Sequence, residues 1–167
     1  MTSTMRKGLA VAALHVAIVA SLGAKLLADR ATRPRVWART APFDPNLPIR
    51  GRYVRLRVMA IPGPGANEVQ RPWNLSWFAL SADGGRLVAT PLPVRSGVTG
   101  TVVDRAGERI VELAEPLAYF IPEHVPDPSQ RPAGEELWVE VTVPRAGAPR
   151  PIRLGVKKDG VLTPLND

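Results

Sequence analysis

An uninterrupted apolar run near the N-terminus is the first strong pattern in the chain. Residues 8–24 read GLAVAALHVAIVASLGA and carry no formal charge. Lys25 can extend its ammonium group toward lipid head groups, so that the two following leucines lengthen the run to the roughly 20 residues that cross a bilayer as a helix. We therefore predict a transmembrane anchor over residues 8–28, after a short basic N-terminus over residues 1–7.

A cleaved signal peptide has a similar pattern and is an open alternative. Arg6 and Lys7 form a positive n-region, and Ser21-Leu22-Gly23 resembles a small-x-small cleavage site. The apolar run fits both interpretations.

The rest of the chain shows the two-residue alternation of β-strands. After Arg30, no segment keeps apolar residues at helical spacing over three turns, whereas alternation recurs between Gly and Pro residues. About eight short strands in about 130 residues are typical of sandwiches and barrels. We predict an all-β domain over residues 51–167, an antiparallel β-sandwich or small barrel. The predicted strands are residues 53–60, 75–80, 86–90, 98–103, 109–113, 136–143, 152–156 and 161–162.

Turn residues predict how these strands connect. Asp83-Gly84-Gly85, Asp104 to Gly107 and Asp159-Gly160 each separate two strands, which is the signal of a β-hairpin. The strand over 75–80 is apolar on nearly both faces and is predicted to be central. The strand over 136–143 is predicted to have a solvated acidic face.

Proline marks two long loops. Residues 60–72 and residues 122–132 contain several prolines, which cannot donate to a β-ladder. Long loops often carry binding sites, but this composition also occurs in loops without a function. Both interpretations stay open.

The basic charge lies beside the apolar run. The net charge is +7, yet residues 30–57 alone contain eight arginines and one aspartate, and the remainder after residue 57 is slightly acidic. Each such residue near an anionic membrane contributes about 1 kcal/mol of attraction. We predict a basic, proline-rich juxtamembrane stalk over residues 29–50 that contacts anionic lipid, and we expect no nucleic-acid partner.

The charge pattern gives conflicting signals for orientation. Two basic residues precede the apolar run and five follow it closely, which by the positive-inside rule would keep the domain in the cytoplasm. A short N-terminus followed by one anchor and a long domain is instead typical of a signal anchor that exports the domain. We predict a single-pass protein of the cell membrane with its domain on the outer side.

Composition argues against catalysis. The chain has no cysteine and only two histidines, His15 and His124, so we expect no metal site and no cofactor. No lysine lies between Lys25 and Lys157 to serve a Ser/Lys dyad, and no serine has a nucleophile-elbow setting. Phosphate-loop and dinucleotide motifs do not occur.

The segment RTAPFDPNLPIRGRYVRLRV over residues 39–58 resembles the signature of the GDYxxLxY family of bacterial membrane-anchored proteins. Residues 119–123 are similar to the second characteristic stretch of that family. Arg52 replaces the motif Asp, and Val58 replaces its final Tyr. The resemblance implies a single anchor and an exported domain in the cell envelope, and implies no reaction. The matching residues are Thr40, Pro42, Asp44, Pro45, Arg50, Gly51, Tyr53 and Leu56.

This segment has two physical interpretations. In the first, Asp44 starts a turn and Arg50 reaches back to it, so that the motif holds a loop closed. In the second, the segment offers an arginine-rich edge to phosphate or carboxylate groups. The candidate binding residues are Asp44, Arg50, Gly51, Arg52, Tyr53, Arg55, Leu56 and Arg57.

Together these patterns predict a membrane-anchored, non-catalytic interaction or assembly module with a membrane-protein partner. The alternative is a hydrolase or ligand-binding sandwich with its site under the proline-rich loops. Glu123, His124 and Asp127 would supply the polar groups of that site.

Overall fold

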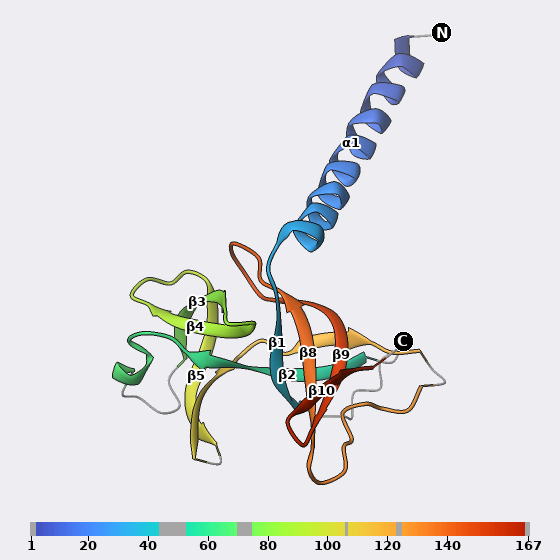
Figure 1. Ribbon diagram of the computed structural model, residues 1–167. Coiled ribbons are helices and arrows are strands. Elements are labelled where there is room, and N and C mark those ends of the chain that lie inside the picture. The colour runs from blue at the N-terminus through green and yellow to red at the C-terminus, as the bar shows by residue number, and fades with distance from the viewer. Residues whose placement is uncertain (1–2, 44–52, 70–74, 106, 123–124, 166–167) are drawn as a thin grey trace. The chain divides into compact units, whose positions relative to one another are not determined.

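The computed structural model describes residues 3–43, 53–69, 75–105, 107–122 and 125–165 (Figure 1). The chain forms two compact units, one up to Arg33 and one from Pro34 onward. The first is a single helix and the second is a β domain, and each is described by itself.

The first unit is helix α1, Ser3–Thr32. Leucine and valine side chains are exposed along its length, as at Leu9 and Val19, which are 62% and 72% exposed. Polar side chains within the run bond to carbonyl oxygens of the same helix: His15 Nδ1 donates to Val11 at 2.8 Å, and Ser21 Oγ donates to Ile18 at 2.8 Å. The helix therefore exposes apolar groups and satisfies its polar ones internally, as a bilayer requires.

Residues Thr4–Thr32 are long and apolar enough to cross a membrane, which confirms the predicted apolar helix. A signal sequence has the same properties, so both interpretations of this segment fit the structure. The helix extends a few residues beyond the predicted bounds of 8–28 at either end.

The second unit contains ten strands and one short 3₁₀ helix, η1 (Ala66–Glu68), within its described residues. The strands are β1 (Arg35–Pro42), β2 (Tyr53–Pro62), β3 (Ser76–Asp83), β4 (Arg86–Leu92), β5 (Val98–Arg105), β6 (Glu108–Leu113), β7 (Leu117–Phe120), β8 (Glu135–Thr142), β9 (Arg150–Lys158) and β10 (Val161–Pro164).

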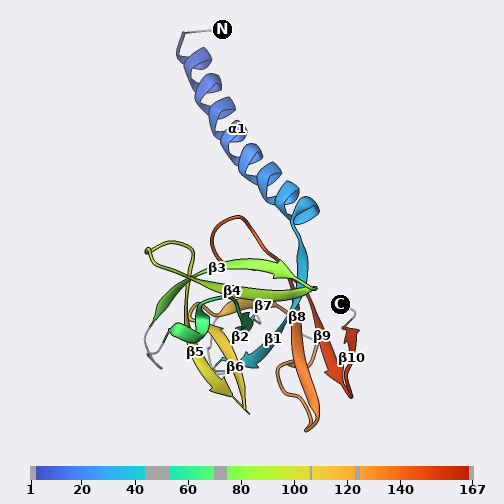
Figure 2. The same cartoon turned by 60° about the vertical axis from the view of Figure 1, so that its left-hand side comes forward.

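Six of these strands close into a barrel in the order β1-β4-β3-β5-β6-β2, because β2 also pairs with β1. The pairings of β4 with β1 and with β2 are parallel, at Trp37 opposite Arg86 and at Ile61 opposite Val88. The other pairings are antiparallel. Strands β8, β9 and β10 extend the sheet from β1, and β7 extends it from β2 (Figure 2).

The predicted all-β class is therefore confirmed, with two corrections. The domain is a mixed barrel rather than a purely antiparallel sandwich or barrel, because β4 pairs in parallel with β1 and with β2. It also has ten strands rather than about eight, since β1 and β7 were not predicted.

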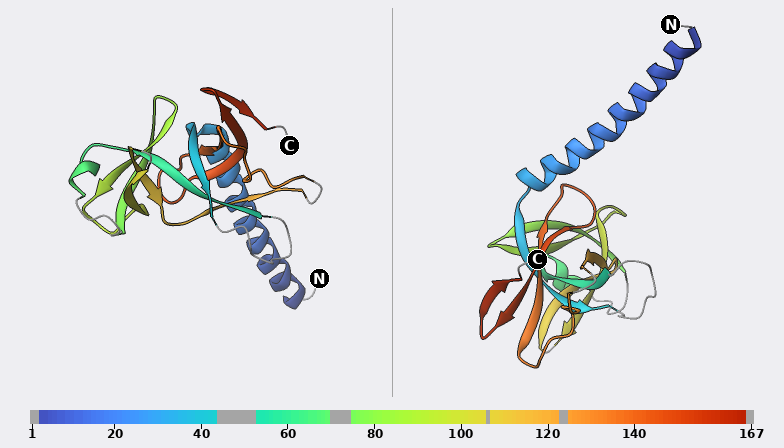
Figure 3. Two further views of the ribbon diagram at one scale, coloured as in Figure 1. Left: turned by 90° about the horizontal axis from the view of Figure 1, so that it is seen from below. Right: turned by 90° about the vertical axis from the view of Figure 1, so that its right-hand side faces the viewer.

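The predicted hairpins are confirmed. β3 and β4 pair up to Asp83 opposite Arg86, and the two glycines between them have φ of 54° and 75°. Positive φ at both central residues is what a type I′ turn needs. The β9–β10 hairpin has the same arrangement at Asp159 and Gly160, and it is visible at the C-terminal end of the chain in Figure 3. β5 and β6 form the third hairpin.

Strand β1 corrects the predicted stalk. Residues 35–42 were assigned to a juxtamembrane stalk over 29–50, but they pair with β2 on one side and with β8 on the other. Val36, Ala38 and Thr40 alternate into the interior, where they are at most 8% exposed. The β domain therefore begins directly after the helix, and only Arg33 and Pro34 separate α1 from β1.

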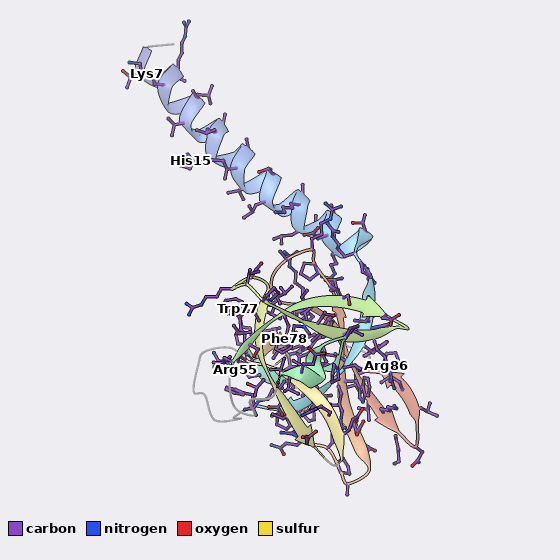
Figure 4. All side chains as sticks on the ribbon, turned by 90° about the vertical axis from the view of Figure 1, so that its left-hand side faces the viewer. Lys7, His15, Arg55, Trp77, Phe78 and Arg86 are labelled. Atoms are coloured by element: carbon purple, nitrogen blue, oxygen red, sulfur yellow. The ribbon has the colours of Figure 1, made fainter. Side chains whose placement is uncertain are left out.

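The interior of the barrel is filled by inward-facing side chains from every part of the domain. Phe78, which Figure 4 shows near the middle of the domain, is fully buried. β3 lies between β4 and β5 as predicted, but its other side chains are partly or fully exposed. The other large side chains that are fully buried are Leu56, Leu87, Val58, Val111, Val139 and Val141.

The predicted solvated acidic face of residues 136–143 is wrong in its second half. Glu140 is 9% exposed and Thr142 is 2% exposed; Glu140 lies opposite Trp37 of β1 and Arg153 of β9, whose large side chains flank it on the same face. The Glu140 carboxylate accepts a hydrogen bond from Arg153 Nε at 2.7 Å. This ion pair compensates for the burial of the carboxylate.

Candidate binding groove

Several predicted site residues lie outside the described residues. These are Asp44, Arg50, Gly51 and Arg52 of the motif, together with Glu123 and His124 of the alternative site. The structure places the remaining five, which are Tyr53, Arg55, Leu56, Arg57 and Asp127.

Three motif side chains lie on the outward face of β2, and one lies inside. Tyr53 and Arg55 are exposed, whereas Leu56 is fully buried in the core. Arg57 Nη1 donates to Glu112 Oε2 at 3.2 Å. The burial of Leu56 and the ion pair of Arg57 give both residues a structural role within the barrel.

The exposed motif residues share a small hollow with the alternative site. Tyr53, Arg55 and Asp127 line a space of about 30 Å³, beside Phe43 and Ser129. The Asp127 carboxylate accepts a hydrogen bond from the Ser129 backbone N–H at 2.8 Å, which closes a local turn. This space has room for a water molecule or two and is too small for a substrate.

A larger hollow of about 220 Å³ lies where β1, β2, β4, β6, β8 and β9 meet on the outside of the barrel, and we call it the groove. It is lined by Trp37, Ala38, Arg39, Met59, Ala60, Ile61, Arg86, Leu87, Glu108, Ile110, Glu136, Trp138 and Lys157.

The floor of the groove is apolar. Met59 and Ile110 are 5% and 6% exposed, yet neither belongs to the cluster that fills the barrel interior. Met59 is opposite Arg39 in the pairing of β1 and β2, so its side chain lies on the outward face with that arginine. The barrel thus buries apolar side chains on its outside, beneath the groove.

Two indole rings form the walls. Trp37 is on β1 and Trp138 is on β8, and both are partly exposed. The Arg153 guanidinium lies 5.6 Å from the centroid of the Trp37 ring. Gly155 leaves room for that ring, since a Cβ added there would lie 2.8 Å from Trp37 Cζ3.

The rim of the groove contains three cations and two carboxylates. Arg39 Nη2 lies 2.7 Å from Glu136 Oε1, and Arg39 Nη1 lies 3.8 Å from Glu108 Oε2. Glu136 also accepts a hydrogen bond from Trp138 Nε1 at 3.1 Å. Arg39 therefore joins β6 to β8 across the groove and compensates both carboxylates.

Among the described residues, the other two cations, Arg86 and Lys157, pair with no carboxylate. Lys157 Nζ lies 4.9 Å from the centroid of the Trp138 ring. Arg86 is exposed, and within the described part of the chain neither it nor Lys157 forms an ion pair. In Figure 4, Arg86 and the motif residue Arg55 lie on different sides of the domain. The groove and the exposed motif residues Tyr53 and Arg55 therefore belong to separate surfaces.

A second hollow of similar size, about 250 Å³, lies beside Trp77. Glu115 is the one charged side chain in its described lining, and Gly97, Gly147 and Ala148 form much of the remainder. It offers one aromatic side chain and few polar groups, so the groove is the stronger candidate for binding.

Sequence reasoning missed the groove, although one signal was present. Trp138 was predicted on a solvated strand face, where a large aromatic side chain is unusual and points to a contact surface. Trp37 and Arg39 were assigned to a stalk. Among the described residues, no three His, Cys, Asp or Glu side chains gather closely enough to bind a metal ion.

Comparisons of this chain with family models, curated proteins and solved structures gave no match. The resemblance of residues 39–58 to the GDYxxLxY family therefore stays a prediction from those residues.

Proposed function

We propose that this chain is a membrane-anchored, non-catalytic interaction module that binds a membrane-protein partner through the groove. The observation that carries the proposal is the apolar floor of Met59 and Ile110 outside the barrel core, between two tryptophans and a charged rim. An apolar centre with Trp and Arg at its border is typical of the residues that dominate protein interfaces.

The size of the groove favours a protein partner. Sites for whole small molecules have volumes of roughly 300–1,000 Å³. The groove has about 220 Å³, which suits one bulky side chain of a partner together with its neighbouring backbone. Two of its charged groups are already engaged with each other, since Arg39 lies 2.7 Å from Glu136.

The short connection to the helix favours a partner in or at the same membrane. α1 ends at Thr32 and β1 begins at Arg35. The connection of three residue steps is a tether of at most about 11 Å. A tether this short raises the effective concentration of membrane-bound partners relative to freely diffusing ones.

We also propose that the domain lies on the outer side of the membrane, in line with the signal-anchor arrangement and the family resemblance. Fusions of alkaline phosphatase and of green fluorescent protein to the C-terminus test this. We expect phosphatase activity without fluorescence, and fluorescence without phosphatase activity would contradict the exported orientation.

Photocrosslinking in the native membrane tests the proposed function. A photoreactive p-benzoylphenylalanine replaces Arg86 at the rim of the groove, and in a control variant it replaces Val94, which is 60% exposed. Val94 lies two residues beyond the far end of β4, and the strand from Arg86 to Leu92 spans about 20 Å. We expect a discrete crosslinked protein from position 86 and none from position 94. Equal products from both positions, or none from position 86, would contradict the proposal.

A further inference from the structure

We infer that the groove binds an acidic segment of the partner protein, in which one apolar side chain lies on the floor and flanking carboxylates contact Arg86 and Lys157. This inference rests on the proposed function and specifies the chemistry of the partner at the same site.

The balance of positive and negative groups on the rim indicates that the ligand carries negative charge. Its two carboxylates are both within 4 Å of Arg39, and Glu136 has a further donor in Trp138 Nε1. Arg86 and Lys157 are left without an ion-pair partner in the described chain. Cations at an interface are compensated best by carboxylates or phosphates on the partner.

The Arg86 guanidinium has one acidic neighbour on its own hairpin. Asp83 is directly opposite Arg86 in the pairing of β3 and β4, but the two side chains form no ion pair in the described structure. Arg86 thus keeps its five N–H donors for solvent or a ligand.

The floor provides the apolar part of the site. Met59 and Ile110 are nearly buried, and the two indole rings border them. An apolar side chain placed there would remove the remaining apolar surface from water, which stabilises a complex by about 25 cal/mol per Å² buried. Methionine in the floor can adapt its rotamer to different apolar side chains.

The two carboxylates on the rim argue against a polyanion such as nucleic acid or a strongly anionic membrane surface. The Glu108 side chain is 64% exposed, so it would face the phosphates of any ligand that covers the whole rim. A peptide can instead place a carboxylate at Arg86 and a neutral group at Glu108. The geometry therefore favours an acidic peptide segment over a lipid or nucleic-acid surface.

The inference is tested by peptide display on the full chain in nanodiscs of zwitterionic lipid. A library of random 12-residue peptides is selected for binding, after depletion on empty nanodiscs. We expect selected peptides to carry Asp or Glu beside Leu, Ile, Phe or Met. Enrichment of basic peptides, enrichment without acidic residues, or no enrichment over empty nanodiscs would overturn the inference.

Charge-reversal variants then locate the binding. The double variant R86E/K157E should bind the selected peptides at least roughly tenfold more weakly, since two attractive contacts become repulsive. R95E reverses one exposed arginine outside the groove and should change the affinity less than twofold. Unchanged thermal unfolding of both variants shows that folding is intact. Equal affinities of R86E/K157E and the natural chain would overturn the inference.

The two proposals fail in distinguishable ways. If photocrosslinking from position 86 captures a protein but the selected peptides are not acidic, the groove binds a partner of different chemistry and only the inference fails. If neither experiment gives a product at the groove, the proposed function fails as well.

Discussion

Replacing Gly155 with alanine should destabilise the β domain through the wall of the groove. Gly155 is opposite Trp138 in the pairing of β8 and β9, and its open side is covered by the Trp37 ring. A Cβ at this position would lie 2.8 and 2.9 Å from two carbons of that ring and 3.1 Å from the Thr163 carbonyl oxygen. These separations are shorter than carbon contacts allow, so the indole must move.

The expected cost follows from the contacts that are lost. Added volume in a packed site costs typically about 1–3 kcal/mol. Moving the indole also weakens its contact with Arg153, whose guanidinium is 5.6 Å away, and such a partly exposed cation–π contact contributes about 0.5–1 kcal/mol. We expect a total near 2 kcal/mol, which lowers the Tm of a domain of this size by about 8 °C.

Thermal unfolding of the full chain in detergent, followed by circular dichroism, measures this cost. The decisive control is a double-mutant cycle with Trp37→Ala, because removing the indole removes the clash. Gly155→Ala should lower Tm strongly in the natural chain and by less than about 2 °C when Trp37 is already alanine. Equal decreases in the two backgrounds, or no decrease in the natural chain, would refute the reasoning.

Three further substitutions give outcomes of different size, each measured by thermal or denaturant unfolding of the full chain. Leu56→Ala should lower the free energy of unfolding by about 3–4 kcal/mol, because Leu56 is fully buried in the core. Tyr53→Ala, at an exposed motif position, should lower it by less than about 1 kcal/mol. Equal losses from the two substitutions would contradict the core role of Leu56. Glu112→Ala should lower the free energy of unfolding by only about 1 kcal/mol, because both arginines that pair with Glu112 are more than a third exposed. The loss should be smaller still in high salt, and a loss above about 3 kcal/mol would refute this reasoning. Gly97→Ala should prevent stable folding, since φ at Gly97 is 88° and an added Cβ would collide with the Phe78 carbonyl group; an unchanged Tm would show that this loop is placed differently.

The hairpins and the apolar helix could be predicted because their signals are local. Gly84 and Gly85 specify a two-residue turn, and the apolar run fixes the helix without reference to the remainder of the chain. The same alternation was present in β1, where Val36 and Ala38 alternate with Trp37 and Arg39. Its arginines and neighbouring prolines favoured a stalk, and only pairing with β2 and β8 makes it a strand.

The barrel closure and the groove could not be predicted because they depend on distant pairings. Trp37 and Trp138 are brought together by the pairing of β1 with β8, about a hundred residues apart in the chain. Arg39 was predicted to contact anionic lipid as part of the stalk, but its guanidinium forms ion pairs with Glu108 and Glu136 instead. Local periodicity identifies which residues face outward, and it does not identify which outward faces meet.

The most direct test of the central claim is ¹⁹F NMR of the full chain in nanodiscs, with 5-fluorotryptophan at its four tryptophan positions. Single Trp→Phe variants assign the resonances, and the protein captured from position 86 is added. If the groove is the binding surface, the resonances of Trp37 and Trp138 shift or broaden while that of Trp77 stays unchanged. A change at Trp77 with Trp37 and Trp138 unaffected would contradict the account.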